Sequence, residues 1–193
     1  MSQGLIVVLS GASSVGKGKI VEELLKDPDL KLMYSISLTT RPQKEHEVDG
    51  EDYYFVTHKQ FATALKKKEL LEYTSFNGYY YGTPRAQVDF LVEQGKNVLL
   101  EVEAQGVGQV KLFKPDALCF FVLPKSFEDL ERQIHEIYGD NDASAEMRIN
   151  KARMEMELAP LWRNTVTNED IPLAVAQIKA KILETLEARK NKK

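Results

Sequence analysis

The sequence predicts an α/β fold of three layers, a parallel sheet with helices on both of its faces. Apolar runs typical of buried strands occur at 5–9, 97–103 and 118–123, and helical patterns alternate with them along the chain. A glycine-rich turn also joins the first apolar run directly to a helical pattern. Strands that alternate with helices are typical of parallel sheets, because each helix carries the chain back to the start of the next strand.

The turn after the first strand has the pattern of a phosphate-binding loop. Gly11, Gly16 and Lys17 fit G-x-x-x-x-G-K, and a helix is expected from about Val15 to Lys26. Glycines let several backbone N–H groups point into one concavity, the helix N-terminus adds positive charge, and the lysine reaches the outer phosphates. The alternative is a tight turn with incidental glycines, which the strand, the spacing and the lysine together disfavour.

Between this unit and the next apolar run, residues 35–83 predict a small, mainly β insertion. Strands are expected at 32–38 and 52–56, and a short helix follows Thr57, which is a plausible N-cap. The narrow apolar face of that helix consists of Phe61, Leu65 and Ala64. A hairpin is expected from the strands 70–76 and 79–82, because Asn77-Gly78 between them is a strong two-residue turn signal.

The second half of the chain returns to the alternating pattern. Helices are expected at 84–94, where Gly95 ends the helix, and then at 126–138, 144–161 and 171–189, with a short strand at 165–167. The predicted domain division is therefore a core of 1–34, 84–125 and 163–193, the insertion 35–83, and a helical segment 126–162.

Composition narrows the class of protein. A chain of 193 residues is long enough for one domain with a real core, and a net charge of −3 argues against general binding of nucleic acid. Cys119, the only cysteine, excludes an internal disulfide and is expected to be a buried, inert thiol. The absence of a signal peptide and of any membrane-length apolar run leads us to expect a cytoplasmic protein that does not contact membranes.

The insertion carries a second group of residues with recognisable chemistry. Arg41 and Lys44 lie three residues apart, and Tyr53 and the tyrosines at 79–81 belong to the same small sheet, so cations and phenols converge as a second phosphate group requires. The carboxylates of Glu72 and Glu103 suit a base with adjacent N–H donors, which guanine has and adenine lacks. Tyrosines that pack the sheet beneath solvated charges are an equally good interpretation of these residues alone.

Several motifs in one order resemble the guanylate kinase family over essentially the whole chain. Ser37-x-Thr39-Thr40-Arg41 followed by the segment 47–55 is similar to the signature of the family's nucleoside-monophosphate site. The segment 78–84 (Gly-Tyr-Tyr-Tyr-Gly-Thr-Pro) matches the turn that follows, and 100–106 (Leu-Glu-Val-Glu-Ala-Gln-Gly) matches a strand that ends in an acidic residue and Gln-Gly.

This resemblance implies transfer of the γ-phosphoryl group of ATP to GMP with Mg²⁺, by a protein with a P-loop core, a GMP-binding insertion (35–83) and a mobile lid (126–162). It implies that ATP and GMP are the partners, without nucleic acid or membrane, in a monomer or homodimer. The implied catalytic residues are Lys17, Arg148 and Arg41. The implied ATP-binding residues are Gly11, Ala12, Ser13, Ser14, Val15, Gly16, Lys17 and Gly18. For GMP they are Ser37, Glu72, Thr83 and Glu103 around the base, and Arg41, Lys44, Tyr53 and Tyr81 around the phosphate.

Some positions depart from the family pattern. Gly18 and Lys19 replace the usual hydroxyl residues for Mg²⁺, Lys44 replaces an arginine, His46 replaces a glycine, and Glu103 replaces an aspartate. Two lid arginines correspond to Gln133 and Ile137, and Arg132, Arg153 and Arg163 are candidates to compensate. A catalytically weak or inactive relative that binds a guanine nucleotide or a protein is therefore the alternative, and a kinase for another small acceptor ranks last.

Overall fold

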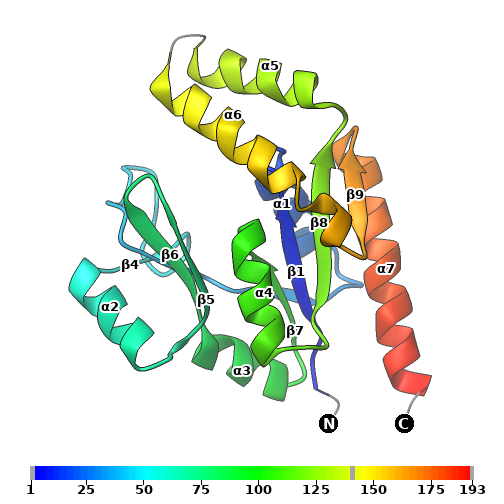
Figure 1. Ribbon diagram of the computed structural model, residues 1–193. Helices are drawn as coiled ribbons and strands as arrows, with labels where there is room; N and C mark the ends of the chain where they lie inside the picture. The colour runs from blue at the N-terminus through cyan, green and yellow to red at the C-terminus, as the bar shows by residue number, and fades with distance from the viewer. Residues whose placement is uncertain (1–2, 140–141, 192–193) are drawn as a thin grey trace.

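The computed structural model describes residues 3–139 and 142–191. Within these residues, five strands form a parallel sheet in the order β2-β7-β1-β8-β9. The strands are β1 (Ile6–Gly11), β2 (Leu32–Tyr34), β7 (Asn97–Glu101), β8 (Leu118–Pro124) and β9 (Thr165–Asn168). Figure 1 shows β1 in the middle of this sheet, so the loop that follows it opens at the centre of the edge formed by the carboxyl ends of the strands.

Side chains of β1 alternate between the two faces of the sheet and build two hydrophobic cores. Val7 and Leu9 pack in one core with the helices α1 (Lys17–Lys26) and α7 (Ile171–Asn191). Ile6 and Val8 pack in the other core with α3 (Arg85–Glu93) and α4 (Ala104–Phe113). All four β1 residues are buried because helices cover both faces. The predicted three-layer α/β fold is therefore confirmed.

Helix α4 was not predicted from the sequence. Gly106 and Gly108 lie inside it, and glycine is a poor helix former. Position 106 must be glycine for steric reasons, because a Cβ atom there would lie 2.5 Å from Oε2 of Glu72 and 2.8 Å from Cγ1 of Val102. The helix can approach the neighbouring strand only because this side chain is missing.

In the same described part of the chain, a second sheet has four strands in the order β4-β3-β6-β5. These are β3 (Leu38–Thr39), β4 (Tyr54–Phe55), β5 (Leu70–Phe76) and β6 (Tyr79–Pro84), with α2 (His58–Lys66) packed against them. The predicted hairpin is present, and its turn residues Asn77 and Gly78 have φ of 50° and 77°, as a type I′ turn requires. Thr57 caps α2 in a capping box with Gln60.

Two predictions for this region are wrong. The expected strand 32–38 breaks into β2 and β3, which belong to different sheets. The backbone N–H of Ser35 still donates to the carbonyl of Leu99 (3.0 Å), and the chain then leaves the core sheet for the second sheet. Leu65 was expected on the apolar face of α2 but is 37% exposed, whereas Phe61 and Ala64 are buried, because the sheet covers only a narrow strip of so short a helix.

The helical segment consists of α5 (Phe127–Tyr138) and α6 (Ala143–Met156), which lie together at the end of the molecule away from the two termini (Figure 1). The helix expected over 144–161 is shorter, and a separate 3₁₀ turn, η1 (Ala159–Leu161), follows it. Pro160 lies in that turn and cannot continue an α-helix. Trp162 comes next and packs on Phe121 with ring centroids 5.0 Å apart.

Cys119 on β8 is half-buried rather than fully buried, and its surroundings raise the pKa of the thiol through burial. This agrees with an unreactive thiol, because only the thiolate is a good nucleophile. None of the helices in residues 3–139 and 142–191 combines the length and the apolar character that crossing a membrane requires.

Candidate active site

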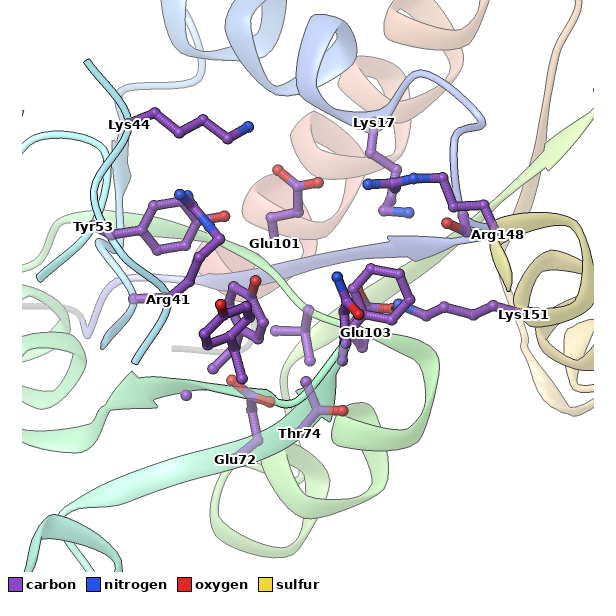
Figure 2. Close-up of a pocket in the computed structure, with 18 of the residues that line it drawn as sticks. Lys17, Arg41, Lys44, Tyr53, Glu72, Thr74, Glu101, Glu103, Arg148 and Lys151 are labelled. Atoms are coloured by element: carbon purple, nitrogen blue, oxygen red, sulfur yellow. Dashed lines mark ion pairs between the residues drawn. The ribbon is translucent and has the colours of Figure 1, made fainter. Parts of the chain in front are cut away.

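A cavity of about 410 Å³ lies where the core sheet, the second sheet and α6 meet. Ten of the residues that the sequence singled out line it: Ser13, Lys17, Ser37, Arg41, Lys44, Tyr53, Glu72, Tyr81, Glu103 and Arg148. In Figure 2, Arg41, Lys44 and Tyr53 lie at one side of the cavity, and Lys17, Arg148 and Lys151 lie at the other. Residues from three separate parts of the chain therefore face one space.

The phosphate loop has the backbone geometry that its sequence pattern predicts. Gly11 has no room for a side chain, because a Cβ atom would lie 2.4 Å from the carbonyl oxygen of Val122. Gly16 caps α1 in the left-handed conformation (φ 91°). The Nζ of Lys17 donates to the carbonyls of Gly11 (2.9 Å) and Ala12 (3.0 Å), which places the ammonium group across the loop. The loop N–H groups, the helix N-terminus and this cation together make a site for anions.

Of the predicted loop residues, only Ser13 and Lys17 are among those that line the large cavity. Val15 lines a separate hollow of about 260 Å³ at the other side of the loop, together with Gln133 and Asn168. Gly11, Ala12, Ser14, Gly16 and Gly18 shape the loop without lining either space.

The buried end of the cavity is acidic. Glu72 on β5 pairs in register with Thr83 on β6, and the Thr83 hydroxyl donates to Oε1 of Glu72 (2.6 Å). Thr83 therefore lies behind Glu72 rather than in the cavity lining. Glu72 is 4% exposed, and burial raises its pKa to about 7. A carboxyl group in this state can accept hydrogen bonds from N–H donors of a ligand once it is ionised.

At the side of the cavity where Arg41, Lys44 and Tyr53 lie, the charge is positive and strongly oriented. Arg41 makes a bidentate pair with Glu47 (Nη2–Oε1 2.7 Å, Nη1–Oε2 3.0 Å), and this pairing lowers the pKa of Glu47 to about 2. The backbone N–H of Lys44 donates to the same carboxylate (2.9 Å). The guanidinium of Arg41 also lies 5.4 Å from the ring centre of Tyr53, and burial raises the pKa of that phenol to about 12. Glu47 thus orders the loop that presents two cations and a protonated phenol.

Sequence reasoning missed several residues of the cavity. Lys151 is the most important, because its Nζ lies 2.8 Å from Oε2 of Glu103. It lies one turn after Arg148 on α6, so helical spacing from Arg148 was the signal that could have found it. Glu101, the last residue of β7, also lines the cavity, and burial raises its pKa. The other missed lining residues with side chains are Tyr34, Thr74, Phe76, Asn77 and Val102, whereas Tyr79 belongs to the tyrosine cluster that the sequence singled out.

The two residues of the helical segment that replace family arginines, Gln133 and Ile137, differ in position. Gln133 lines the hollow beside the phosphate loop, whereas Ile137 is 67% exposed. Of the three candidate replacement arginines, Arg132 lines the same hollow as Gln133. Arg153 instead stacks over the ring of Phe127 (4.8 Å), and Arg163 is exposed.

The geometry combines an anion-binding loop, a second set of cations and buried carboxylates in one cavity, and comparison with known proteins identifies where this combination occurs. The family model described as guanylate kinase matches residues 3–185. The chain belongs to the guanylate kinase family. The family resemblance predicted from the sequence is therefore confirmed.

Curated guanylate kinases from several bacteria are similar over most of this chain. The protein from Streptococcus thermophilus is 39% identical over 92% of this chain and 85% of its own length. The protein from Enterococcus faecalis is 41% identical over 92% of this chain and 87% of its own length. The guanylate kinase of Mycoplasma mycoides is 39% identical over 92% of this chain, which spans only 60% of the length of that relative.

A crystal structure of guanylate kinase from Anaplasma phagocytophilum has the same fold. It superposes with a TM-score of 0.76 and 27% sequence identity, over 96% of this chain and 87% of the other. The guanylate kinase fold thus extends through the core sheet, the second sheet and the helical segment described above.

Proposed function

We propose that this protein transfers the γ-phosphoryl group of ATP to GMP and releases ADP and GDP. The observation that carries the proposal is the shared cavity: the phosphate loop (Ser13, Lys17) faces the same space as Arg41 and Glu72. A donor phosphate on the loop and an acceptor phosphate on Arg41 would meet in it. The names of the similar proteins support the same reaction.

In the donor half, the loop N–H groups and Lys17 would hold the phosphates of ATP. The hollow of about 260 Å³ on the other side of the loop suits the nucleoside part of ATP, since Val15 of the loop lines it. In the acceptor half, Arg41, Lys44, Tyr53 and Tyr81 would bind the phosphate of GMP. Ser37, Glu72 and Glu103 would contact guanine, and Thr83 would complete the guanine site by holding Glu72 from behind.

The reaction needs charge neutralisation more than acid–base catalysis. The phosphate of GMP is largely ionised at neutral pH, so its oxygen can attack without a general base. Lys17, Arg148 and Arg41 would neutralise charge on the transferring group and its acceptor. Arg148 lies above the rings of Tyr138 (4.6 Å) and Phe76 (5.5 Å), which hold the guanidinium at the edge of the cavity.

Mg²⁺ would enter with ATP as part of the co-substrate. Among the described residues, no group of three or more His, Cys, Asp or Glu side chains is arranged to hold a metal ion. The loop also lacks the usual hydroxyl, since Gly18 and Lys19 follow the lysine. The residues present therefore do not form a metal site of their own, and phosphate oxygens and water would supply the ligands.

The partners, the compartment and the roles of the two inserted segments are part of the same proposal. ATP and GMP are the partners, and the net charge of −3 gives no support for nucleic acid as a ligand. We place the reaction in the cytoplasm, by a monomer or homodimer, and assign residues 35–83 to GMP binding and 126–162 to the lid.

A coupled assay of ADP release with GMP, dGMP, AMP and UMP tests the proposal. We expect turnover with GMP and dGMP, little with AMP or UMP, and loss of turnover in Lys17→Met, which controls for a contaminating kinase. Absence of turnover with GMP at high enzyme concentration would refute it. In that event, calorimetric binding of GMP without transfer would assign the alternative role of a guanine-nucleotide-binding module.

A further inference from the structure

Glu155 joins the lid helix α6 to the phosphate loop. Its Oε2 accepts a hydrogen bond of 2.7 Å from the backbone N–H of Ser13, although the two residues are 142 positions apart in the chain. Glu155 is 7% exposed and lies in the last turn of α6. A negative charge is unfavourable at a helix C-terminus and in a buried position. Both features favour a neutral carboxyl group at this position.

On its other side Glu155 contacts the acceptor pocket. Its carboxyl group and that of Glu103, which lines the large cavity, lie on either side of the Lys151 ammonium group, and each affects the pKa of the other. Lys151 lies 2.8 Å from Oε2 of Glu103 and 4.0 Å from Oε1 of Glu155. Ionised carboxylates only accept hydrogen bonds, so a hydrogen bond between these two groups requires that one of them carry a proton.

The position of Lys151 indicates which carboxyl group carries that proton. Because the ammonium group is closer to Glu103, the ionised form is stabilised there. Burial opposes ionisation of Glu103, but hydrogen bonding to Glu155 and the charges of Lys151 and Lys17 lower its pKa. Burial and the neighbouring Glu103 raise the pKa of Glu155 to about 8, against the opposing effect of Lys151 and Lys17.

We propose that Glu155 is a positioning residue that works as a neutral carboxylic acid: it accepts from the Ser13 N–H of the phosphate loop and donates to Glu103. This arrangement fixes the donor loop, the lid helix and the acceptor pocket relative to one another. The proposal rests on the proposed function, since the arrangement serves a reaction between two phosphate groups held on either side of it.

Loss of the proton has two consequences in this geometry. Glu155 and Glu103 become like charges in contact, and the new carboxylate faces the loop where the phosphates of ATP would bind. Activity should therefore fall as pH rises through the pKa of Glu155, about 8. At one unit above this pKa only about a tenth of the molecules keep the proton.

The charged groups around Glu155 are Glu103 beside α4, Lys151 on α6 and Lys17 on α1. Glu72 and Glu101 are further carboxyl groups close to Glu103. Glu72, with a pKa of about 7, also titrates near neutrality. Glutamine at position 155 separates these effects, because its amide accepts from Ser13 and donates to Glu103 at every pH while all other groups remain.

The test compares kcat and KM from about pH 6.5 to 9.5 in wild type, Glu155→Gln and Glu155→Ala. We expect Glu155→Ala to lose about tenfold or more in kcat/KM, the effect of about one hydrogen bond to a charged partner. Glu155→Gln should recover most of this loss near pH 7 and stay level to pH 9, where wild type falls about tenfold. Glu157→Gln, an exposed change at the end of the same helix, is the matched control and should follow wild type.

A wild-type pH profile in Glu155→Gln, or full activity in Glu155→Ala, would overturn the proposal.

A second measurement needs no nucleotide. Native Glu155 keeps a proton between the ordinary pKa of 4.5 and about 8, where the unfolded chain has lost it. The stability of wild type should therefore decrease relative to Glu155→Gln as pH rises across this window. Parallel stability profiles would also overturn the proposal, whereas inactivity of wild type with GMP would refute only the proposed function.

Discussion

Glu72 shows how a single buried carboxyl group can make acceptor binding depend on pH. Its pKa of about 7 is a consequence of burial, which the hydrogen bond from Thr83 offsets only in part. The ionised form is the one that accepts two N–H donors from a guanine ring. Binding of GMP should therefore release a proton from Glu72.

The first prediction follows from that linkage. The Kd for GMP should decrease about tenfold between pH 6 and pH 8, because about a tenth of the Glu72 carboxyl groups are ionised at the lower pH. Titration calorimetry measures this change. The phosphate of GMP titrates in the same range, so Glu72→Gln is the control. This variant should bind GMP more weakly, and its Kd should change less with pH than that of wild type, because only the phosphate still titrates. An identical slope in both proteins would contradict the assignment.

A second prediction concerns the departures from the family pattern. Gly18 begins the exposed side of α1, its φ is not positive, and no described heavy atom lies within 4 Å of a Cβ atom built there. Gly18→Ser with Lys44→Arg should raise kcat/KM by about tenfold or more. The serine restores a hydroxyl ligand for Mg²⁺, and the arginine restores a second, charge-assisted hydrogen bond to phosphate worth about 1.5 kcal/mol. The coupled assay measures the rate, and Gly18→Ala with Lys44→Arg isolates the contribution of the hydroxyl. An unchanged rate would mean that these residues do not limit activity.

Among the elements, helix α4 shows a conflict between local preference and packing. Its glycines weaken the helix, but Gly106 leaves the space that Glu72 and Val102 occupy. Gly108, two residues later, has no described atom within 4 Å of a Cβ position. The two glycines of one helix therefore have different reasons to be glycine.

The third prediction uses this difference. Gly106→Ala should raise the KM for GMP by about tenfold or more, because the new methyl group displaces the carboxyl group of Glu72, and the KM for ATP should change little. Gly108→Ala should instead stabilise the protein by about 0.5–1 kcal/mol without a change in either KM. Steady-state kinetics and urea unfolding give the two readouts. Equal effects of the two substitutions on the KM for GMP would refute this account.

Elements with strong local signals were predictable from sequence. The hairpin at Asn77-Gly78 and the cap at Thr57 depend on residues within a few positions of each other, and both are present. The division of 32–38 between two sheets was not predictable from local sequence. It depends on a contact with a distant strand, since the chain leaves the core sheet after the backbone N–H of Ser35 has bonded to Leu99 of β7. Helix α4 was missed because glycines disfavour a helix, and the reason for Gly106 is contact with Glu72, on a strand 30 or more positions away.

At the scale of the whole molecule, parallel strands explain why the candidate site could be anticipated in part. The order β2-β7-β1-β8-β9 brings the loop after β1 next to the ends of β7 and β8, so Lys17 and Glu103 meet without proximity in sequence. The chemistry of the insertion already singled out Arg41 and Glu72, and the family resemblance added Arg148. Lys151 was not found although its helical spacing from Arg148 was a signal for it, and Glu155 was not found because only the docking of α6 on the loop reveals its contact with Ser13.

Trp162 gives movement of the proposed lid an optical signal. It is the only tryptophan of the chain, it follows the end of the lid helices, and its indole packs 5.0 Å from the ring of Phe121 in the core. A rotation of α5 and α6 toward bound nucleotides that the 3₁₀ turn transmits would turn this ring or change its solvent contact. The intrinsic fluorescence of the unmodified protein should therefore change in intensity or wavelength when ATP and GMP analogues bind together, so stopped-flow measurements can time lid closure without an attached dye. Trp162→Phe, which removes the signal and keeps an aromatic ring against Phe121, is the control.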